Sequence, residues 1–193
     1  MNRFYLLVGL LALGAAQSFA EEPVTTWRGI LNHPAEWYAS SDATRIARNV
    51  LAYQHLNGGW GKNVNMARLM SDDERAEIAR GSRTVDTTID NGATHRQLRY
   101  LARVTIGTDD QQFRDAFFRG FDFLLEAQYE NGGWPQFYPL RSGYYEHITF
   151  NDDAMIGVMS LLRDVAGKSG FEFVDGREKR KQQPQLRRDW RSS

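Results

Sequence analysis

Hydrophobic positions recur at helical spacing through most of the chain. Apolar side chains lie three or four residues apart over residues 46–54, 113–128 and 155–162, and this spacing places them on one face of an α-helix. No long stretch alternates apolar and polar residues as a β-strand does. The pattern therefore predicts an all-α chain with few or no strands.

Helix-start signals agree with this pattern at two places. Ser71 and Glu74 have the spacing of a capping box, and so do Thr108 and Gln111, because the hydroxyl can bond an unpaired amide while the fourth residue reaches back. Gly81 is placed to end the helix that begins after Ser71. We therefore expect a short helix before Gly81 and a longer one that starts at Thr108.

The chain also repeats itself. The segment QHLNGGW at 54–60 is echoed by QYENGGW at 128–134, and TIDNGA at 88–93 is echoed by TFNDDA at 149–154. Each copy has the order helix, NGGW loop, polar segment, helix. One such unit cannot bury its own apolar face, so neighbouring units must stack. We expect helical hairpins arranged as a partial α/α toroid.

The two NGGW loops predict tight turns with a buried aromatic side chain. Adjacent glycines permit a sharp reversal of the chain after a helix end. Trp60 and Trp134 can then fold back between repeats while the indole N–H bonds a carbonyl. We favour this packing role over stacking on a ligand.

Two polar clusters precede apolar helical runs at equivalent places in the repeats. One Asp or Asn in each cluster is explained as a helix N-cap, but each cluster has more oxygen-bearing side chains than one cap needs. A toroid brings them to the same end of adjacent helices, and convergent oxygen ligands suit Ca²⁺, or less well Mg²⁺ or Mn²⁺. The candidate metal ligands are Asp90, Asn91, Asn151, Asp152 and Asp153.

Cationic and aromatic side chains follow the two NGGW loops. Such side chains at the mouth of a helical ring suit recognition of a charged sugar, although a solvated surface is the more ordinary explanation for Lys62 and Arg141. The candidate substrate-binding residues are Lys62, Asn63, Arg141, Tyr144, Tyr145 and His147.

Charge and composition narrow the function classes and the compartment. The 193 residues carry 24 basic and 24 acidic side chains and no cysteine, which excludes a generally basic nucleic-acid binder and a thiolate zinc site. Residues 1–20 have the charged start, apolar run and small-residue end of a signal peptide. The apolar run is too short to span a membrane, so we expect a secreted or periplasmic protein with no membrane partner after leader removal.

The two ends of the chain differ from the middle. Residues 177–193 contain seven basic and two acidic side chains with no apolar period, so we expect a basic, disordered tail. The folded unit is then expected over 21–176, and it is acidic overall. An acidic surface binds a polyanion poorly unless a cation lies between them.

Four blocks of sequence together resemble the family 10 pectate lyases. They are YQHLNGGWGKN at 53–63, TTIDNGATHRQLRYLA at 87–102, NGGWPQFYPL at 131–140 and YYEHITFNDDAM at 144–155. The resemblance spans roughly residues 26–175. It implies an α/α toroid, secretion, calcium dependence and β-eliminative cleavage of polygalacturonate, with Asp90 and Asp152 at the acidic positions of the family's calcium site.

The chain departs from the family beyond about residue 176. Family members use an arginine from the second half of the domain to remove a proton, and no residue here corresponds to it, as in a truncated or frameshifted product. We therefore expect impaired cleavage, or alternatively a non-catalytic module that binds acidic polysaccharide. A prenyl-processing or cyclase toroid is a weaker third alternative, because the chain lacks the zinc-ligand and acidic motifs that those proteins need.

Overall fold

The computed structural model describes residues 25–82 and 86–175, so the predicted signal peptide (1–20) and basic tail (177–193) lie outside the described residues. The α-helices are α1 (Ser41–Ala52), α2 (Asp72–Arg80), α3 (His95–Thr108), α4 (Gln111–Glu126) and α5 (Ala154–Ala166). Short 3-10 helices are η1 (Ala35–Ala39), η2 (Asp90–Gly92), η3 (Gly143–Glu146), η4 (Asn151–Asp153) and η5 (Glu172–Asp175). Within these described ranges, β structure is limited to isolated bridges. The all-α prediction is confirmed.

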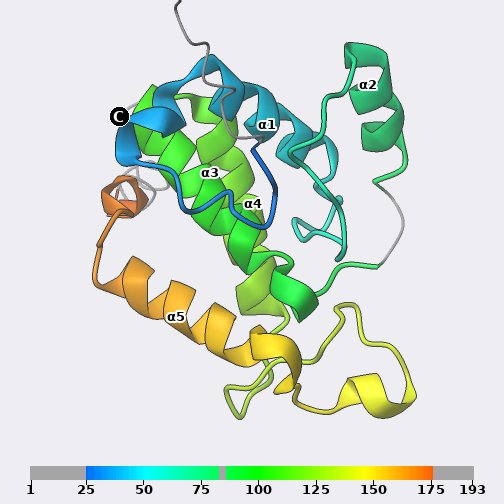
Figure 1. Ribbon diagram of the computed structural model, residues 1–193. Coiled ribbons are helices and arrows are strands. Elements are labelled where there is room, and N and C mark those ends of the chain that lie inside the picture. Colours follow the sequence, from blue (N-terminus) through cyan, green and yellow to red (C-terminus); the bar gives the residue numbers. More distant parts are fainter. Residues whose placement is uncertain (1–24, 83–85, 176–193) are drawn as a thin grey trace, which may run out of the picture.

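Helix α3 lies at the centre of the packing. It contacts α4, α1, α5 and η1, and Figure 1 shows α3 and α4 in green between α1 in blue-cyan and α5 in orange. The buried face of α3 contributes Leu98, Leu101 and Val104, and α4 contributes Phe117 and Phe123. These side chains belong to one continuous hydrophobic core, which fixes the helix ends that carry the polar segments.

One predicted capping box is present and the other is wrong. The Ser71 hydroxyl accepts from the Glu74 amide, the Glu74 carboxylate accepts from the Ser71 amide, and Gly81 caps the end of α2. In contrast, α3 continues through Thr108, whose hydroxyl donates to the Val104 carbonyl at 2.7 Å. Asp110 caps α4 instead, because its side chain accepts from the Gln112 amide.

Both NGGW tryptophans are buried packing side chains, as predicted. Trp60 and Trp134 are 0% and 2% exposed. The Trp60 indole N–H donates to the Val50 carbonyl at 2.8 Å, and the Trp134 indole N–H donates to the Leu124 carbonyl at 2.7 Å. Each indole thus closes its loop back onto the preceding helix, which sets where the chain leaves that helix.

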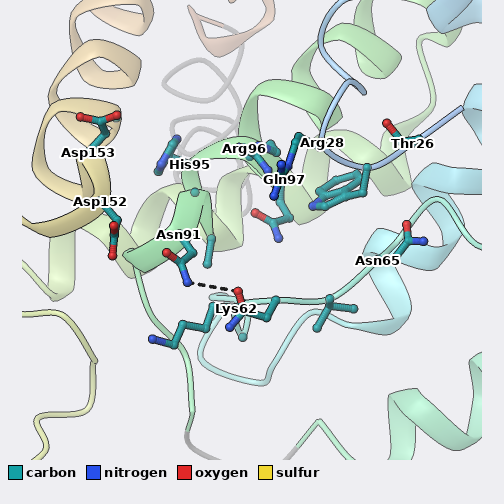
Figure 2. A pocket seen from close by; sticks show the side chains of 17 residues that line it. Thr26, Arg28, Lys62, Asn65, Asn91, His95, Arg96, Gln97, Asp152 and Asp153 are labelled. Atoms are coloured by element: carbon teal, nitrogen blue, oxygen red, sulfur yellow. Dashed lines mark hydrogen bonds between the residues drawn. The ribbon is translucent and has the colours of Figure 1, made fainter.

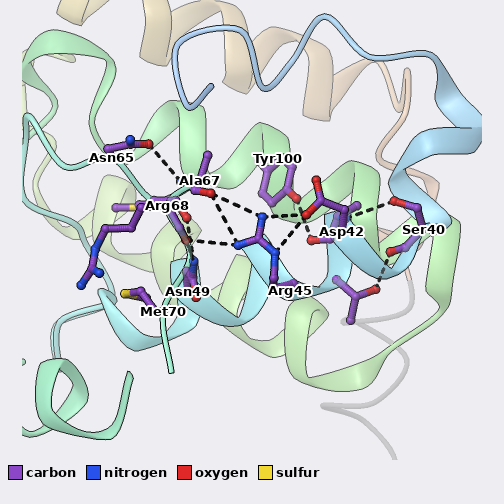
Figure 3. Close-up of polar contacts among 12 residues, drawn as sticks. Ser40, Asp42, Arg45, Asn49, Asn65, Ala67, Arg68, Met70 and Tyr100 are labelled. Carbon is purple, nitrogen blue, oxygen red and sulfur yellow. Dashed lines mark hydrogen bonds and ion pairs between the residues drawn. The ribbon is translucent and has the colours of Figure 1, made fainter. Parts of the chain in front are cut away.

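The loop after Trp60 is held to α1 by side-chain hydrogen bonds (Figure 3). The Asn49 amide donates to the carbonyls of Met66 and Arg68, each at 2.9 Å, and Arg45 also donates to the Arg68 carbonyl, at 3.1 Å. Asn49 is fully buried, and its bond to the Met66 carbonyl is shielded from water and is stronger for it. These hydrogen bonds fix the loop 61–70, which forms part of the cleft described below.

Helix α5 has apolar side chains on both of its faces. Met155, Val158 and Leu161 are buried, whereas Ile156 and Met159 are 56% and 52% exposed. The helical pattern at 155–162 therefore combines an inner and an outer apolar face. No described helix combines the length and the apolar character that crossing a membrane requires.

Candidate functional site

A cleft of about 850 Å³ lies where the two repeats meet (Figure 2). Four parts of the chain line it: residues 26–28, the loop 61–65, the η2 turn with the first turn of α3, and η4 with the start of α5. Because these segments are far apart in sequence, the cleft exists only when both repeats are folded against each other.

The η2 and η4 turns share an uncommon backbone conformation. Asn91 has φ 51° and ψ 32°, and Asp152, the equivalent residue of the second repeat, has φ 46° and ψ 41°. Short polar side chains tolerate this left-handed region better than other non-glycine residues do. The two turns also contact each other. The repeat therefore places Asn91 beside the second polar cluster, and Asn91, Asp152 and Asp153 line the same cleft.

Asp90 is held in a buried ion pair. Its side chain is 3% exposed, and Oδ2 accepts from Lys62 Nζ at 2.5 Å and from Gln136 Nε2 at 2.6 Å. Burial raises the pKa of Asp90, but the hydrogen bonds from Lys62 and Gln136 outweigh burial and hold that pKa below its ordinary value. Asp90 is therefore ionised and paired, and it is not among the residues that line the cleft.

The side chains that line the cleft near η4 have the donor chemistry of a calcium site. Asp152 and Asp153 supply carboxylates, and Asn91 donates from Nδ2 to Asn63 Oδ1 at 3.1 Å. That bond leaves Asn91 Oδ1 as a further acceptor. Among the described residues, no three Asp, Glu, His or Cys side chains gather as a metal site. Calcium here would be held by two carboxylates with amide and ligand oxygens.

The remaining predicted metal ligand lies apart from the cleft. Asn151 is exposed and donates from Nδ2 to the Tyr144 hydroxyl at 2.7 Å. It does not line the cleft. Its amide instead links η4 to the aromatic segment 144–145.

Phe137 gathers several of the predicted sugar-binding side chains. Lys62 Nζ lies 5.5 Å from the Phe137 ring centroid and Arg141 Cζ lies 3.9 Å from it, which is cation–π distance. The Tyr145 ring packs edge-on at 5.2 Å, and Tyr144 packs against Tyr145. The sequence analysis missed Phe137 and also Gln136 above, although both lie within three residues of Trp134.

His147 stands apart from this group. It lines a separate hollow with Tyr129, Asn131 and Glu146. The structure therefore brings Lys62 and Asn63 to the cleft and places His147 outside it.

Two further side chains of the cleft were not predicted as ligands. Burial, with the nearby charges of Arg96 and Arg99, lowers the pKa of His95 to about 4, so its imidazole is neutral at pH 7. Gln97 is 2% exposed, and its Oε1 has no hydrogen-bond partner among the described residues. Their only sequence signal is their position in the first turn of α3, just after the polar segment.

Comparison with known proteins identifies the class of protein. The family model for pectic acid lyase matches residues 54–188, and the chain belongs to this family. A solved structure of a family 10 polysaccharide lyase from Cellvibrio cellulosa is similar over 76% of this chain and 42% of that chain, with 37% identity and a TM-score of 0.61.

A second solved structure is an Asp-to-Ala mutant of the family 10 polysaccharide lyase from Cellvibrio cellulosa in complex with trigalacturonic acid. It is 35% identical with a TM-score of 0.59, over 77% of this chain and 45% of that chain. The chain thus spans less than half the length of these solved structures. Their fold confirms the partial α/α toroid. No curated protein matches the chain.

Proposed function

We propose that the cleft binds polygalacturonate through a calcium ion, for β-eliminative cleavage of the polymer. Membership of the pectic acid lyase family and the trigalacturonic acid complex of a similar protein support the substrate class. The observation that carries the proposal is the convergence of Asn91, Asp152 and Asp153 from two equivalent turns on one cleft.

The residues of the cleft have distinct roles in this proposal. Asp152 and Asp153 hold the cation with the oxygen of Asn91. Calcium, when bound, offsets the charge of a uronate carboxylate and stabilises the negative charge that develops as the adjacent carbon loses its proton. Lys62 is held between Asp90 and the Phe137 ring, so its ammonium is fixed beside the cleft while the Asp90 carboxylate offsets its charge.

The second candidate function is binding without cleavage. The cleft titratable side chain closest to a base at neutral pH is His95, and with a pKa of about 4 it is a weak one. In that case the chain binds acidic polysaccharide with calcium and releases no product.

The experiment measures polygalacturonate binding and product release by the full chain in calcium and in EDTA. We expect Asp152→Asn to weaken calcium-dependent binding about tenfold or more, because it removes a charged oxygen ligand. Asp73→Asn, in the exposed first turn of α2, is the matched control and should leave binding unchanged.

Cleavage is followed by the ultraviolet absorbance of the unsaturated uronide. Slow calcium-dependent product release supports a lyase of low activity, whereas tight binding without product supports the binding module. Equal binding in calcium and EDTA, with no loss in Asp152→Asn, contradicts a calcium site at this cleft.

A further inference from the structure

The cleft is divided by charge. Asp152 and Asp153 line one side, and Arg28 and Arg96 line the other, together with Thr26 and Gln97. Figure 2 shows this division, with the two carboxylates on the left and the two guanidinium groups toward the right. The proposed calcium site occupies only the acidic side and leaves the basic side without a role.

The two guanidinium groups are not committed to partners. In the described part of the chain, neither the Arg28 nor the Arg96 guanidinium forms an ion pair or hydrogen bond with another residue. Other arginines there are paired, such as Arg45 with Asp42 and Arg99 with Asp164. A guanidinium that is free of carboxylate can bind one from a ligand through two parallel hydrogen bonds.

Arg96 is also positioned by the turn beside it. Gly92 has φ +78°, and a Cβ on this residue would lie 3.0 Å from Arg96 Nη2. Its lack of a side chain lets the guanidinium lie against the η2 turn. Arg96 is half-buried, so its charge is less screened than that of an exposed arginine. The side chain is therefore held at the cleft wall by packing.

Gln97 gives a second and independent sign of a ligand on this side. Its Oε1 is buried without a hydrogen-bond partner, while its Nε2 faces Met66 Sδ at 3.7 Å. A buried acceptor without a partner is costly, so native structures normally satisfy it with a ligand or water. A sugar hydroxyl is a donor of the required kind, and Gln97 lines the cleft beside the two arginines.

We propose that Arg28, Arg96 and Gln97 form a metal-independent subsite for a second uronate unit of the polymer. The guanidinium groups bind its carboxylate, and Gln97 Oε1 accepts a hydrogen bond from one of its hydroxyls. The subsite rests on the proposed function, since it takes the neighbour of the unit bound at the calcium. It deepens that function by requiring two consecutive charged sugars.

The test measures trigalacturonate binding to the full chain by calorimetry, once in EDTA and once in calcium. In EDTA we expect the double variant Arg28→Gln, Arg96→Gln to bind at least tenfold more weakly than the wild type. Arg96→Lys in place of Arg96→Gln should recover part of the lost affinity, because lysine keeps the positive charge but cannot form the two parallel hydrogen bonds of a guanidinium. Arg48→Gln, an exposed residue of α1 outside the cleft, is the matched control.

The same titrations separate the two sites. Asp152→Asn should lose only the gain in affinity that calcium gives, whereas the double arginine variant should lose the same factor in both buffers. An uncharged galactose trimer should bind weakly and equally to wild type and double variant. Circular dichroism melting of each variant checks the fold.

Three results overturn the subsite. In the first, the double variant binds trigalacturonate within twofold of wild type. In the second, wild-type binding is lost entirely in EDTA. Both leave the calcium-dependent proposed function standing. In the third, wild type fails to bind in either buffer, and the proposed function falls together with the subsite.

Discussion

The two NGGW segments share one set of hydrogen bonds but have different surroundings. In each copy, the asparagine side chain accepts from the second glycine, the glutamine side chain donates to the first glycine carbonyl, and the indole donates to the preceding helix. Yet Gln54 is 7% exposed and also bonds Arg119 and the Ala116 carbonyl, whereas Gln128 is exposed.

The polar turns that follow differ in the same way. Asp90 is buried and paired, while its equivalent, Asn151, is exposed. The first copy is covered by α4 and by residues 135–138 of the second copy, whereas the second loop packs against Ile148 and Glu146. The comparison shows that local sequence determines the turn and that the neighbouring repeat determines its burial.

The largest expected effect is the difference in stability loss between alanine substitutions at Gly58 and at Gly132, the first glycines of the two NGGW loops. A Cβ at Gly58 would lie 2.2 Å from the Arg119 carbonyl oxygen, whereas a Cβ at Gly132 meets only Gln128 Nε2 at 3.9 Å. Gly58→Ala should lower the free energy of unfolding by about 2–5 kcal/mol, from overpacking and backbone strain. Gly132→Ala should cost only the strain, about 1 kcal/mol. Urea unfolding measures both, and equal losses would break the comparison.

The next largest effect is a pH dependence of the free energy of unfolding that arises only in the first copy. His95 has a pKa of about 4 when folded and about 6.5 when unfolded, so the unfolded chain binds the proton more tightly. The neutral His95 side chain makes its full contribution to the free energy of unfolding above pH 6.5. This contribution falls by about 3 kcal/mol as the pH drops to 4. The equivalent residue of the second copy is Ile156, which does not titrate.

Urea unfolding of wild type and His95→Gln at several pH values between 8 and 4 tests this. The difference in the free energy of unfolding between the two proteins should change below about pH 6.5 and stay constant above it. A constant difference at every pH would show that His95 does not resist protonation in the fold.

The smallest expected effect is the difference in stability loss between alanine substitutions at Gln54 and at Gln128. Gln54→Ala leaves the Gly58 carbonyl and part of the Arg119 guanidinium without partners and removes a second bond to the Ala116 carbonyl of α4, which should cost about 2 kcal/mol. Gln128→Ala removes an exposed bond and should cost about 0.5 kcal/mol or less. Thermal unfolding of the matched pair is the measurement. A larger loss in Gln128→Ala would mean that the second loop is covered in solution.

Local features of the fold could be predicted from the sequence. The repeat, the buried tryptophans and the capping box at Ser71 each depend on residues within a few positions of one another. Thr108 was misassigned because Asp110, two residues later, is also a good cap: α3 continues through Thr108, and Asp110 caps α4. Near helix ends, sequence alone leaves such choices open.

The site was only partly predictable, because its contacts are long-range. Asn91 and Asp152 could be recognised as equivalent residues of the two repeats. Asp90 is hydrogen-bonded to Lys62 and Gln136, which are separated from it by 28 and 46 positions in the sequence. Sequence-spacing rules do not predict contacts over such separations. Arg96 and Gln97 have the ordinary composition of a polar helix face. Two structural features distinguish them from other polar helix residues: both line the cleft, and Gln97 Oε1 has no hydrogen-bond partner among the described residues.

The separation of charge across the cleft also has a geometric consequence. A groove with unlike ends is asymmetric, and so is a polysaccharide, whose reducing and non-reducing termini differ. Of the two orientations in which such a strand can lie, the one that fits both ends has the lower energy. If polygalacturonate binds here as proposed, the cleft would select the direction in which the polymer lies past Asp152 and Asp153.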